Sequence, residues 1–435
     1  MTEAAHVGID IGTTSAKICA VKGNEILFEE KRIYEDESSE NGVQNPKVIL
    51  ETVMEMLESV QSKMDAKGMR ISDIWTCGQM HGIVMWNRES AARCSTSCFD
   101  CLAHSPLFNW TYSPPDIRQF IETLPKWSCG ELHPGFGLVS LAFLNKTDPE
   151  SLKQYDQCGT IMDLFLTLLA HNSEPLISHH NAHSWGYCNR NGTWQNERTT
   201  SVLPAWIALP TISKSCTEQV GTWRGAKCHV ATGDLQASVA SLELTDDTAY
   251  VILGTSAQLC CLVNSNDAST ASIPPTVVQL PYNESKSLLA ACSMNGGNAL
   301  ETILKMHSPD AYTSSRLHNS LKELDECAPN MTPGLKVEPI FIAERGVSKH
   351  FSIVNCDSAT TDLQILEATH QGIIANLFSL CPVQLLTSLK IKHLALIGSA
   401  QCPRFKRHID NLVGDIFHFI IPTSLISTPL GATRF

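Results

Sequence analysis

The sequence contains few charged and few aromatic residues, and it has no long uninterrupted run of apolar ones. Charged side chains account for 17% and aromatic side chains for 7% of the 435 residues, and the formal net charge at pH 7 is −12. This negative charge argues against nucleic acid or an anionic membrane surface as the main partner. No window is apolar for the length of a membrane span, and the segment after Met1 lacks the basic and apolar regions of a secretory signal. We therefore expect a cytoplasmic location, with neither a membrane nor nucleic acid as a partner.

The chain also lacks a Gly-x-x-x-x-Gly-Lys-[Ser/Thr] segment, which excludes a Walker-type loop as a phosphate site. Cysteine, by contrast, is abundant, with seventeen residues. Without a secretory signal, we expect these to be reduced thiols rather than disulfides. One group could ligate zinc, but its spacing is irregular and no second Cys/His pair follows, so a surface loop is the favoured interpretation. That group comprises Cys94, Cys98, Cys101 and His104.

The periodicity of the first part of the chain indicates an α/β fold. Hydrophobic residues make up 43% of the sequence, and its length suggests two or three domains. Residues 48–64 have apolar side chains at helical spacing and predict a helix. Residues 74–86, IWTCGQMHGIVMW, have two short apolar runs around a polar centre and predict two strands. Strands that alternate with helices favour mixed sheets. Residues 87–117 are rich in Ser, Cys and Pro and predict a long loop or insertion.

The segment GIDIGTTSAKICAV, residues 8–21, predicts a β-hairpin with a tight turn. Apolar residues alternate with small or polar ones on both sides of Gly-Thr-Thr. The segment YVILGTSAQLCCLV, residues 250–263, aligns with it without a gap, so that Gly12 meets Gly254. This internal repeat predicts two related domains, which we place at residues 1–244 and 245–435.

A repeated Gly-Thr turn is suited to binding phosphate. Glycine lets the backbone approach a ligand, and successive N–H groups in a tight turn form an anion-binding nest. Two such turns facing each other across a cleft would hold a polyphosphate from both sides, and Asp10 is placed to hold Mg²⁺ through water. The alternative is that both turns only close hairpins and that Asp10 is a solvated acid. The turn residues expected to bind phosphate are Gly12, Thr13, Thr14, Gly254, Thr255 and Ser256.

The two hairpins and five further motifs resemble those of a known protein family and occur in the same order along the chain. The opening DIGTTSAK resembles the first phosphate hairpin of the FGGY carbohydrate kinases, and GTS at 254–256 resembles the second. The remaining motifs are GQMHG (78–82), NAHSWGY (181–187), GDLQASV (233–239), SMNGGN (293–298) and ALIGSAQCPRF (395–405). The chain resembles most the members of this family that phosphorylate ketoses, over nearly its whole length.

The resemblance implies a fold, an activity and ligands. The implied fold is the two-domain actin/hexokinase-like ATPase fold, with duplicated ribonuclease H-like domains and a central cleft. The N-terminal domain would bind a small-molecule ketose, and the C-terminal domain would bind ATP. The implied reaction is ATP- and Mg²⁺-dependent phosphorylation of the ketose at its terminal hydroxyl, with seven-carbon sedoheptulose as the expected substrate and another ketose as an alternative.

The resemblance also implies roles for individual residues. Asp234 would be the general base and contact the sugar, although the plain alternative is an N-cap of a helix that starts at Leu235. Asn298 would lie near the nucleotide, with a turn asparagine as the alternative. The other implied sugar contacts are Gln79, Met80 and His81, and the implied adenine-binding turn is Gly398, Ser399 and Ala400.

The chain departs from the family pattern at three places. In NWTYSPPD, Tyr112 and Pro114 stand where the family has Asp and Arg. Leu396 replaces a glycine of the adenine-binding turn, and the chain ends at PLGATRF, where family members continue. We expect a missing last helix to weaken the second domain. These departures motivate a rival hypothesis, a non-catalytic descendant that binds sugar or nucleotide, and a second rival is a chaperone-like or actin-like ATPase. The sequence does not indicate an oligomeric state.

Overall fold

The computed structural model describes residues 3–23, 25–36, 39–94, 98–195, 201–242, 245–265, 272–309, 312–344, 347–422 and 427–435. The chain divides into two compact units, of which the first comprises Met1–Glu243 with Ser427–Phe435 and the second comprises Leu244–Ile426. We expected the boundary after residue 244, and residues 243 and 244 lie outside the described residues. None of the helices described is long and apolar enough to cross a membrane.

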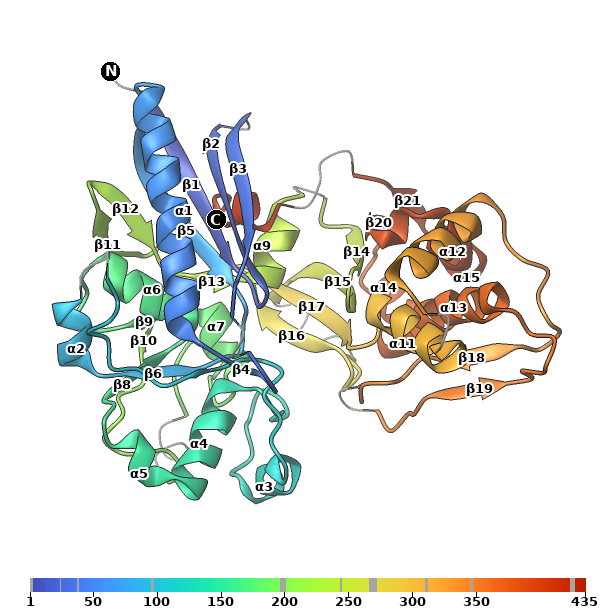
Figure 1. The fold of residues 1–435 in the computed structure, drawn as a ribbon, viewed down its shortest axis with the longest axis horizontal. Coiled ribbons are helices and arrows are strands. Elements are labelled where there is room, and N and C mark those ends of the chain that lie inside the picture. The colour runs from blue at the N-terminus through green and yellow to red at the C-terminus, as the bar shows by residue number, and fades with distance from the viewer. Residues whose placement is uncertain are drawn as a thin grey trace. The chain divides into compact units, whose positions relative to one another are not determined.

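A seven-stranded mixed sheet forms the centre of the first unit (Figure 1). Its strands follow the order β11-β12-β5-β1-β2-β3, and β13 also pairs with β5. β1, β2 and β3 are antiparallel, whereas β1 and β5 are parallel. The strands are β1 (Ala4–Ile11), β2 (Ser15–Lys22), β3 (Glu25–Ile33), β5 (Arg70–Gly78), β11 (Gln219–Trp223), β12 (Ala226–His229) and β13 (Thr232–Gly233).

The predicted hairpin at residues 8–21 is confirmed as β1 and β2, with the turn at residues 12–14. The alternation along β1 divides its side chains between two faces of the sheet. Val7, Ile9 and Ile11 belong to the main hydrophobic core of this unit. Asp10 points to the other face, and it lies directly opposite Lys17 of β2 in the hairpin register. A buried acid in this strand therefore has a basic partner built into the same hairpin.

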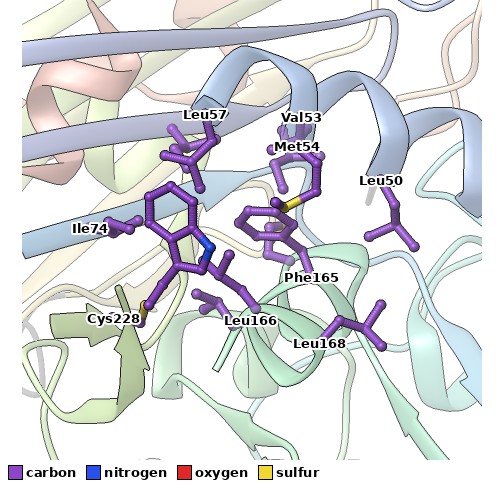
Figure 2. Close-up of a cluster of buried hydrophobic side chains, with 14 of the residues drawn as sticks. Leu50, Val53, Met54, Leu57, Ile74, Phe165, Leu166, Leu168 and Cys228 are labelled. Atoms are coloured by element: carbon purple, nitrogen blue, oxygen red, sulfur yellow. The ribbon is translucent and has the colours of Figure 1, made fainter. Parts of the chain in front are cut away.

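The core on the first face lies between this sheet and two helices, α1 (Pro46–Ala66) and α6 (Ile161–Leu169). The predicted helix at 48–64 is therefore confirmed, and it begins earlier because Asn45 accepts a hydrogen bond from Lys47 N and Pro46 occupies the first turn. Side chains of the two helices meet over the sheet in Figure 2. Those labelled are Leu50, Val53, Met54 and Leu57 of α1, Phe165, Leu166 and Leu168 of α6, Ile74 of β5 and Cys228 of β12.

A second hydrophobic cluster of the first unit lies among its short helices and two-stranded sheets. The predicted strands at 74–86 are confirmed as β5 and β6, which flank the polar loop at 79–83. The short strands are β4 (Val43–Gln44), β6 (Val84–Trp86), β7 (Leu107–Phe108), β8 (Gln157–Gly159), β9 (Leu176–Ile177) and β10 (Thr211–Ile212). The remaining helices are α2 (Arg88–Arg93), α3 (Ile117–Thr123), α4 (Gly137–Thr147), α5 (Pro149–Leu152), α7 (His179–Ser184), α9 (Asp234–Ala240) and α16 (Thr428–Ala432).

Two expectations for residues 87–117 are corrected. The segment is not one long loop, because it contains α2 and β7, and β7 pairs with β4. A disulfide joins Cys94 and Cys101, which are seven residues apart in sequence and whose Cα atoms lie 5.8 Å apart. The expectation that all cysteines are reduced is therefore wrong for this pair. The disulfide also removes two of the four candidate zinc ligands.

The second unit has a six-stranded sheet with the order β16-β17-β15-β14-β20-β21. Its strands are β14 (Thr248–Leu253), β15 (Ala257–Asn264), β16 (Val278–Pro281), β17 (Lys286–Ser293), β20 (His393–Gly398) and β21 (His418–Ile420), and β18 (Lys336–Glu338) pairs with β19 (Ser352–Val354). Its helices are α11 (Gly297–His307), α12 (Ser314–Glu326), α13 (Asp362–Leu380), α14 (Val383–Ser388), the 3₁₀ helix η2 (Ser399–Gln401) and α15 (Pro403–Val413).

The internal repeat of the sequence corresponds to a repeated strand arrangement. In the first unit β1 pairs antiparallel with β2 and parallel with β5. In the second unit β14 pairs antiparallel with β15 and parallel with β20. Gly12 and Gly254 therefore occupy equivalent turns. Gly12 follows β1, which is parallel to β5, and Gly254 follows β14, which is parallel to β20.

The last nine residues pack on the first unit rather than on the second, to which the predicted division assigned them. The helix α16 contacts β1, β2, β5 and α9, and the end marked C in Figure 1 lies beside this sheet. Leu430 joins a small cluster with Cys19 and Val21, and Arg434 Nη1 donates to Ser241 O at 2.9 Å. The end of the chain therefore covers the Asp10 face of the first sheet, and the weakening of the second domain by a missing last helix stays a prediction.

Two glycines make this close packing possible. A Cβ atom on Gly431 would lie 1.8 Å from the carbonyl oxygen of Ala237 in α9, and one on Gly8 would lie 1.8 Å from that of Pro429. Neither contact leaves room for a methyl group, and backbone atoms on both sides cannot move aside cheaply. The helix α16 thus rests directly on β1 and α9.

We predict that Gly431→Ala lowers the free energy of unfolding by about 1–3 kcal/mol, because the added methyl group separates α16 from α9. Chemical denaturation measures this change. Ser238→Ala, on α9 itself, serves as the control and should change stability by less than about 0.5 kcal/mol. Equal stability of both variants and the parent would contradict the packing of α16 described here.

Candidate active site

Asp10 and Lys17 form a buried ion pair across the first hairpin. Only 4% of Asp10 is exposed, and Lys17 Nζ donates to Asp10 Oδ2 at 2.9 Å. Burial raises the pKa of Asp10, while Lys17 and the hydroxyl of Thr428 in α16 hydrogen-bond to it and lower the pKa in part. The alternative of a solvated acid is therefore wrong. Sequence reasoning did not single out Lys17, although its position seven residues after Asp10 across a tight turn is the signal that could have identified it.

Asp234 lies at the start of α9, and the charges of Asp10 and Lys17 affect its pKa. The pKa of Asp234 is raised to about 7, because burial and then the negative charge of Asp10 raise it more than Leu235 N and Lys17 lower it. Its Oδ1 accepts a hydrogen bond from Leu235 N at 2.7 Å. The expected N-cap role is incorrect, because Gly233 is the N-cap and Asp234 is the first helical residue. The structure thus joins Asp10, Lys17 and Asp234 into one charged group on the α16 face of the sheet.

The first turn is closed by a hydrogen bond from Gly12 N to Ser15 O at 3.1 Å. Thr14 is exposed, while Gly12 and Thr13 are half-buried. Thr13 Oγ1 accepts a hydrogen bond from the indole Nε1 of Trp110 at 2.9 Å. Because an indole N–H only donates, the hydroxyl hydrogen of Thr13 is left to donate to another acceptor. This geometry suits a phosphate oxygen.

A buried glutamine, Gln44, connects this turn to neighbouring segments and was not anticipated from the sequence. Its Nε2 donates to Thr13 O at 2.7 Å, and its Oε1 accepts from Asn109 Nδ2 at 3.0 Å and from Gln79 Nε2 at 3.4 Å. Gln44 lies in the two-residue strand β4, far from the turn in sequence. No local pattern reveals such a role, since it arises only from the fold.

The loop at residues 79–81 lies next to the same turn and next to Asp234. Gln79 N donates to Ile11 O at 2.9 Å, and the buried Gln79 Oε1 has no hydrogen-bond partner among the described residues. Met80 packs so closely on Gly233 that a Cβ there would lie 2.6 Å from its sulfur. The structure therefore places Met80 against the residue that precedes the expected general base, and Gln79 next to the first turn.

His81 links this loop to the motif at residues 181–187. Its backbone has a φ of 74°, and its N donates to Ser184 Oγ at 3.1 Å. The ring Nδ1 lies 2.7 Å from Ser184 O, so Nδ1 carries the proton. Trp185 Nε1 donates to Gly82 O at 3.1 Å. The motifs at 78–82 and 181–187, about 100 residues apart, thus form one packed element.

Three segments of the second unit meet where β14 and β20 end. Gly297 N donates to Gly254 O at 2.9 Å, and Asn298 N donates to Thr255 O at 3.2 Å. A Cβ on Gly398, whose φ is 63°, would lie 2.5 Å from Leu253 O. Ser399 and Ala400 follow in η2. The expected phosphate turn, the expected adenine turn and Asn298 are therefore neighbours within this unit.

Asn298 also makes the local contacts of a turn asparagine. Its Oδ1 accepts from Gly296 N at 2.8 Å, and its Nδ2 donates to Met294 O at 3.0 Å. The preceding segment is held by the buried carboxylate of Glu344, which accepts from Ser293 Oγ at 2.6 Å and from Met294 N at 3.0 Å. These contacts fix the glycines that approach the Gly254 turn.

The two substitutions in family-like motifs have structural roles of their own. Tyr112 contacts Phe108 edge to face, and its backbone packs against Gly42, so that it belongs to the packing of the first unit. Leu396 is fully buried in β20 opposite Val251. Leu396 therefore lies in the sheet core, two residues before Gly398 at the end of β20.

Comparisons with known proteins identify the family and the fold of this chain. A family model described as the FGGY family of carbohydrate kinases, N-terminal domain, matches residues 5–239. Human sedoheptulokinase is 29% identical and covers 91% of this chain and 89% of its own length. Mouse sedoheptulokinase is 28% identical, with the same shares of each chain covered.

Solved structures share the fold at low sequence identity. A ligand-bound xylulose kinase from Lactobacillus acidophilus matches with a TM-score of 0.80 and 17% identity, covering 99% of this chain and 88% of that chain. Glycerol kinase from Plasmodium falciparum with ADP matches with a TM-score of 0.79, 16% identity and the same coverage. The expected mixed α/β kinase fold is thereby confirmed.

We predict that the charge of Asp234 lowers stability at neutral and alkaline pH. Its pKa in the fold is about 7, above the ordinary value of 3.8, so the folded state binds the proton more tightly than the unfolded state. The contribution of this group to stability therefore falls as pH rises from about 4 to about 7. Asp234→Asn lacks this fall, and above pH 7 it should be more stable than the parent by about 1–3 kcal/mol. Urea denaturation between pH 5 and about 8 measures the difference. A variant less stable than the parent at pH 8 would contradict the assigned burial.

Proposed function

Because the chain belongs to the FGGY family of carbohydrate kinases, we propose that it transfers the γ-phosphoryl group of ATP to the terminal hydroxyl of a ketose. Its reaction class, a carbohydrate kinase, follows from the family match over residues 5–239. The observation that carries the proposal is the charged group of Asp10, Lys17 and Asp234 beside the 79–81 loop. Sedoheptulose, phosphorylated to sedoheptulose 7-phosphate, is the proposed substrate, supported by relatives of that activity over 91% of the chain.

Asp234 is the proposed general base. Its pKa near 7 lets it be deprotonated at working pH and still accept a proton readily. The sugar hydroxyl gives its proton to Asp234 while its oxygen bonds to the γ-phosphorus, and the bond from phosphorus to the bridging oxygen of ADP breaks. Leu235 N, bonded to Oδ1, holds the carboxylate in place.

Asp10 and Lys17 supply the balancing charges. The residues fit a divalent cation, because the charge of Asp10 raises the pKa of Asp234 and a nearby positive charge would offset this effect. Asp10 would hold Mg²⁺ through water, where the metal neutralises charge on the phosphates. Lys17 opposes the rise that burial causes in the pKa of Asp10, through their hydrogen bond at 2.9 Å.

The sugar and the nucleotide are assigned to different units in this proposal. Gln79 Oε1, buried and without a partner among the described residues, accepts a sugar hydroxyl hydrogen. His81 binds a second hydroxyl, and Met80 packs on the carbon skeleton. In the second unit the turn of Gly254, Thr255 and Ser256 binds phosphate, and the segment of Gly398, Ser399 and Ala400 contacts adenine.

A second candidate is binding without turnover, which the replaced residues Tyr112 and Pro114 favour. A coupled ADP-release assay with a panel of five-, six- and seven-carbon ketoses separates the two candidates. We expect the highest kcat/KM for the seven-carbon ketose. ADP release with none of the ketoses, together with measurable sugar or nucleotide binding, would support the second candidate.

We predict that Asp234→Asn lowers kcat by about 10²–10⁴-fold, because asparagine cannot accept the proton. The affinity for the ketose, measured by calorimetry, should change little. Steady-state kinetics at saturating ketose gives the result. Substantial activity in this variant would eliminate Asp234 as the base.

Asp163→Asn is the matched control for this experiment. Burial also raises the pKa of Asp163 to about 7, but its carboxylate belongs to the capping box of α6 with Thr160. It should therefore share the stability effect of removing a buried acid without losing activity. A comparable loss of kcat in both variants would mean that the Asp234 effect is structural.

We also predict that Asp10→Asn moves the acidic limb of the pH profile of kcat/KM to lower pH. The charge of Asp10 raises the pKa of Asp234, so its removal lets Asp234 ionise more easily. The KM for ATP should rise, while ketose affinity measured without nucleotide should stay within about twofold of the parent. An unmoved or upward-shifted limb, or an equal loss of ketose affinity, would contradict the proposed coupling.

A further inference from the structure

A second cluster of metal-ligating side chains lies in the first unit, away from the charged group of Asp10. His179 and His183 are one turn apart on α7, and Cys188 follows that helix. One ligand atom from each of these residues lies within 4.8 Å of the others, and in the described part of the chain no other set of three or more such side chains meets this condition. His183 belongs to the motif at residues 181–187, but the proposed phosphoryl transfer does not use this cluster.

Local geometry explains why the three side chains converge. Residues four apart on a helix lie on one face, which places the two imidazoles together. Positive φ values at Gly186 and Tyr187, 83° and 56°, then reverse the chain and return Cys188 to the helix. Both His179 Nε2 and Cys188 Sγ lie near a single carbonyl oxygen, that of Asn189, at 3.3 and 3.4 Å. The imidazole contact is long for a hydrogen bond and the thiol is a weak donor, so little is lost if a metal replaces these two contacts.

The surroundings protect the cluster from solvent but leave one side open. His183 is 3% exposed and Cys188 is fully buried, whereas His179 is only half-buried and gives a path for entry. The indole of Trp127 contacts the His183 ring at 4.9 Å, and its Nε1 donates to Cys188 O at 2.9 Å. This indole fixes the two buried ligands relative to each other, as groups around a metal site commonly do.

We propose that His179, His183 and Cys188 bind one Zn²⁺, with water as the fourth ligand. Two imidazole nitrogens and one sulfur form a borderline-soft donor set without carboxylates, which suits zinc and not magnesium or calcium. On binding, the Cys188 thiol releases its proton to solvent and its thiolate bonds to the metal. This inference does not depend on the proposed function.

A metal here would act on the expected sugar segment. The helix α7 that carries His179 and His183 also carries Ser184, which holds His81 through two hydrogen bonds. Zinc would therefore fix α7, and with it the loop at residues 79–81. The zinc site would stabilise the fold, and it takes no part in proton or phosphoryl transfer.

The test uses the full-length protein after removal of metal with a chelator. Titration with Zn²⁺ alone, without nucleotide or sugar, should give one bound zinc per chain. His179→Asn should weaken zinc affinity by about tenfold or more. The main test uses this variant, because His179 is only half-buried and its replacement should leave the fold intact. Zinc should raise the Tm of the parent and have a smaller effect on that of His179→Asn, since a ligand stabilises only the state that binds it.

Cobalt substitution identifies the sulfur ligand. The parent loaded with Co²⁺ should show a thiolate-to-metal charge-transfer band, and Cys188→Ser should lose it. Cys98→Ser is the matched control, because Cys98 belongs to the other cysteine-rich group and should leave zinc binding unchanged. The proposal is overturned by zero zinc stoichiometry in the parent, by equal zinc affinity of the parent and His179→Asn, or by loss of zinc in Cys98→Ser.

Discussion

Asp10 and Lys17 form a buried ion pair on the covered face of the first sheet, and the charges of both act on Asp234. Asp10 and Asp234 each have a pKa raised by burial, and Lys17 is the cation that hydrogen-bonds to Asp10. Burial of like charges is unfavourable unless a cation and hydrogen bonds compensate. The hairpin register supplies the cation, since it sets Lys17 directly opposite Asp10. The start of α9 supplies an N–H to Asp234.

The chain end takes part in this burial. The helix α16 comes from the last residues, yet it lies on β1, β2, β5 and α9, where the hydroxyl of Thr428 hydrogen-bonds to Asp10. Gly8 and Gly431 have no side chains, and this lets the backbones meet. A site that excludes water strengthens electrostatic interactions inside it. The covering by α16 is thus one physical cause of the raised pKa values, and it connects the end of the chain to the proposed chemistry.

The second unit meets a different constraint, close approach of backbone to backbone. Gly296 and Gly297 pack on the Gly254 turn at distances that exclude a Cβ atom. The buried Glu344 holds the segment before these glycines through several donors, including Ser293 and Asn295. Here the geometry of the proposed phosphate-binding turn comes from hydrogen bonds to the backbone and from missing side chains.

Local patterns in the sequence determined the hairpins, the helix after them and the repeated arrangement of the two units. Alternating apolar residues around Gly12 and Gly254 specify strand faces and turns over short distances, which is why these were predictable. The family-like motifs placed Gln79 and Asp234 in one site for the same reason, since each motif is local. The tertiary structure alone decided that Lys17 neutralises Asp10, that Gln44 links Thr13 to Asn109, and that the last residues cover the first unit. It also decided that Cys94 pairs with Cys101, and that His179 and His183 meet Cys188. These contacts depend on which distant segments pack together, and packing is set by the shape of the whole core rather than by the residues that happen to meet.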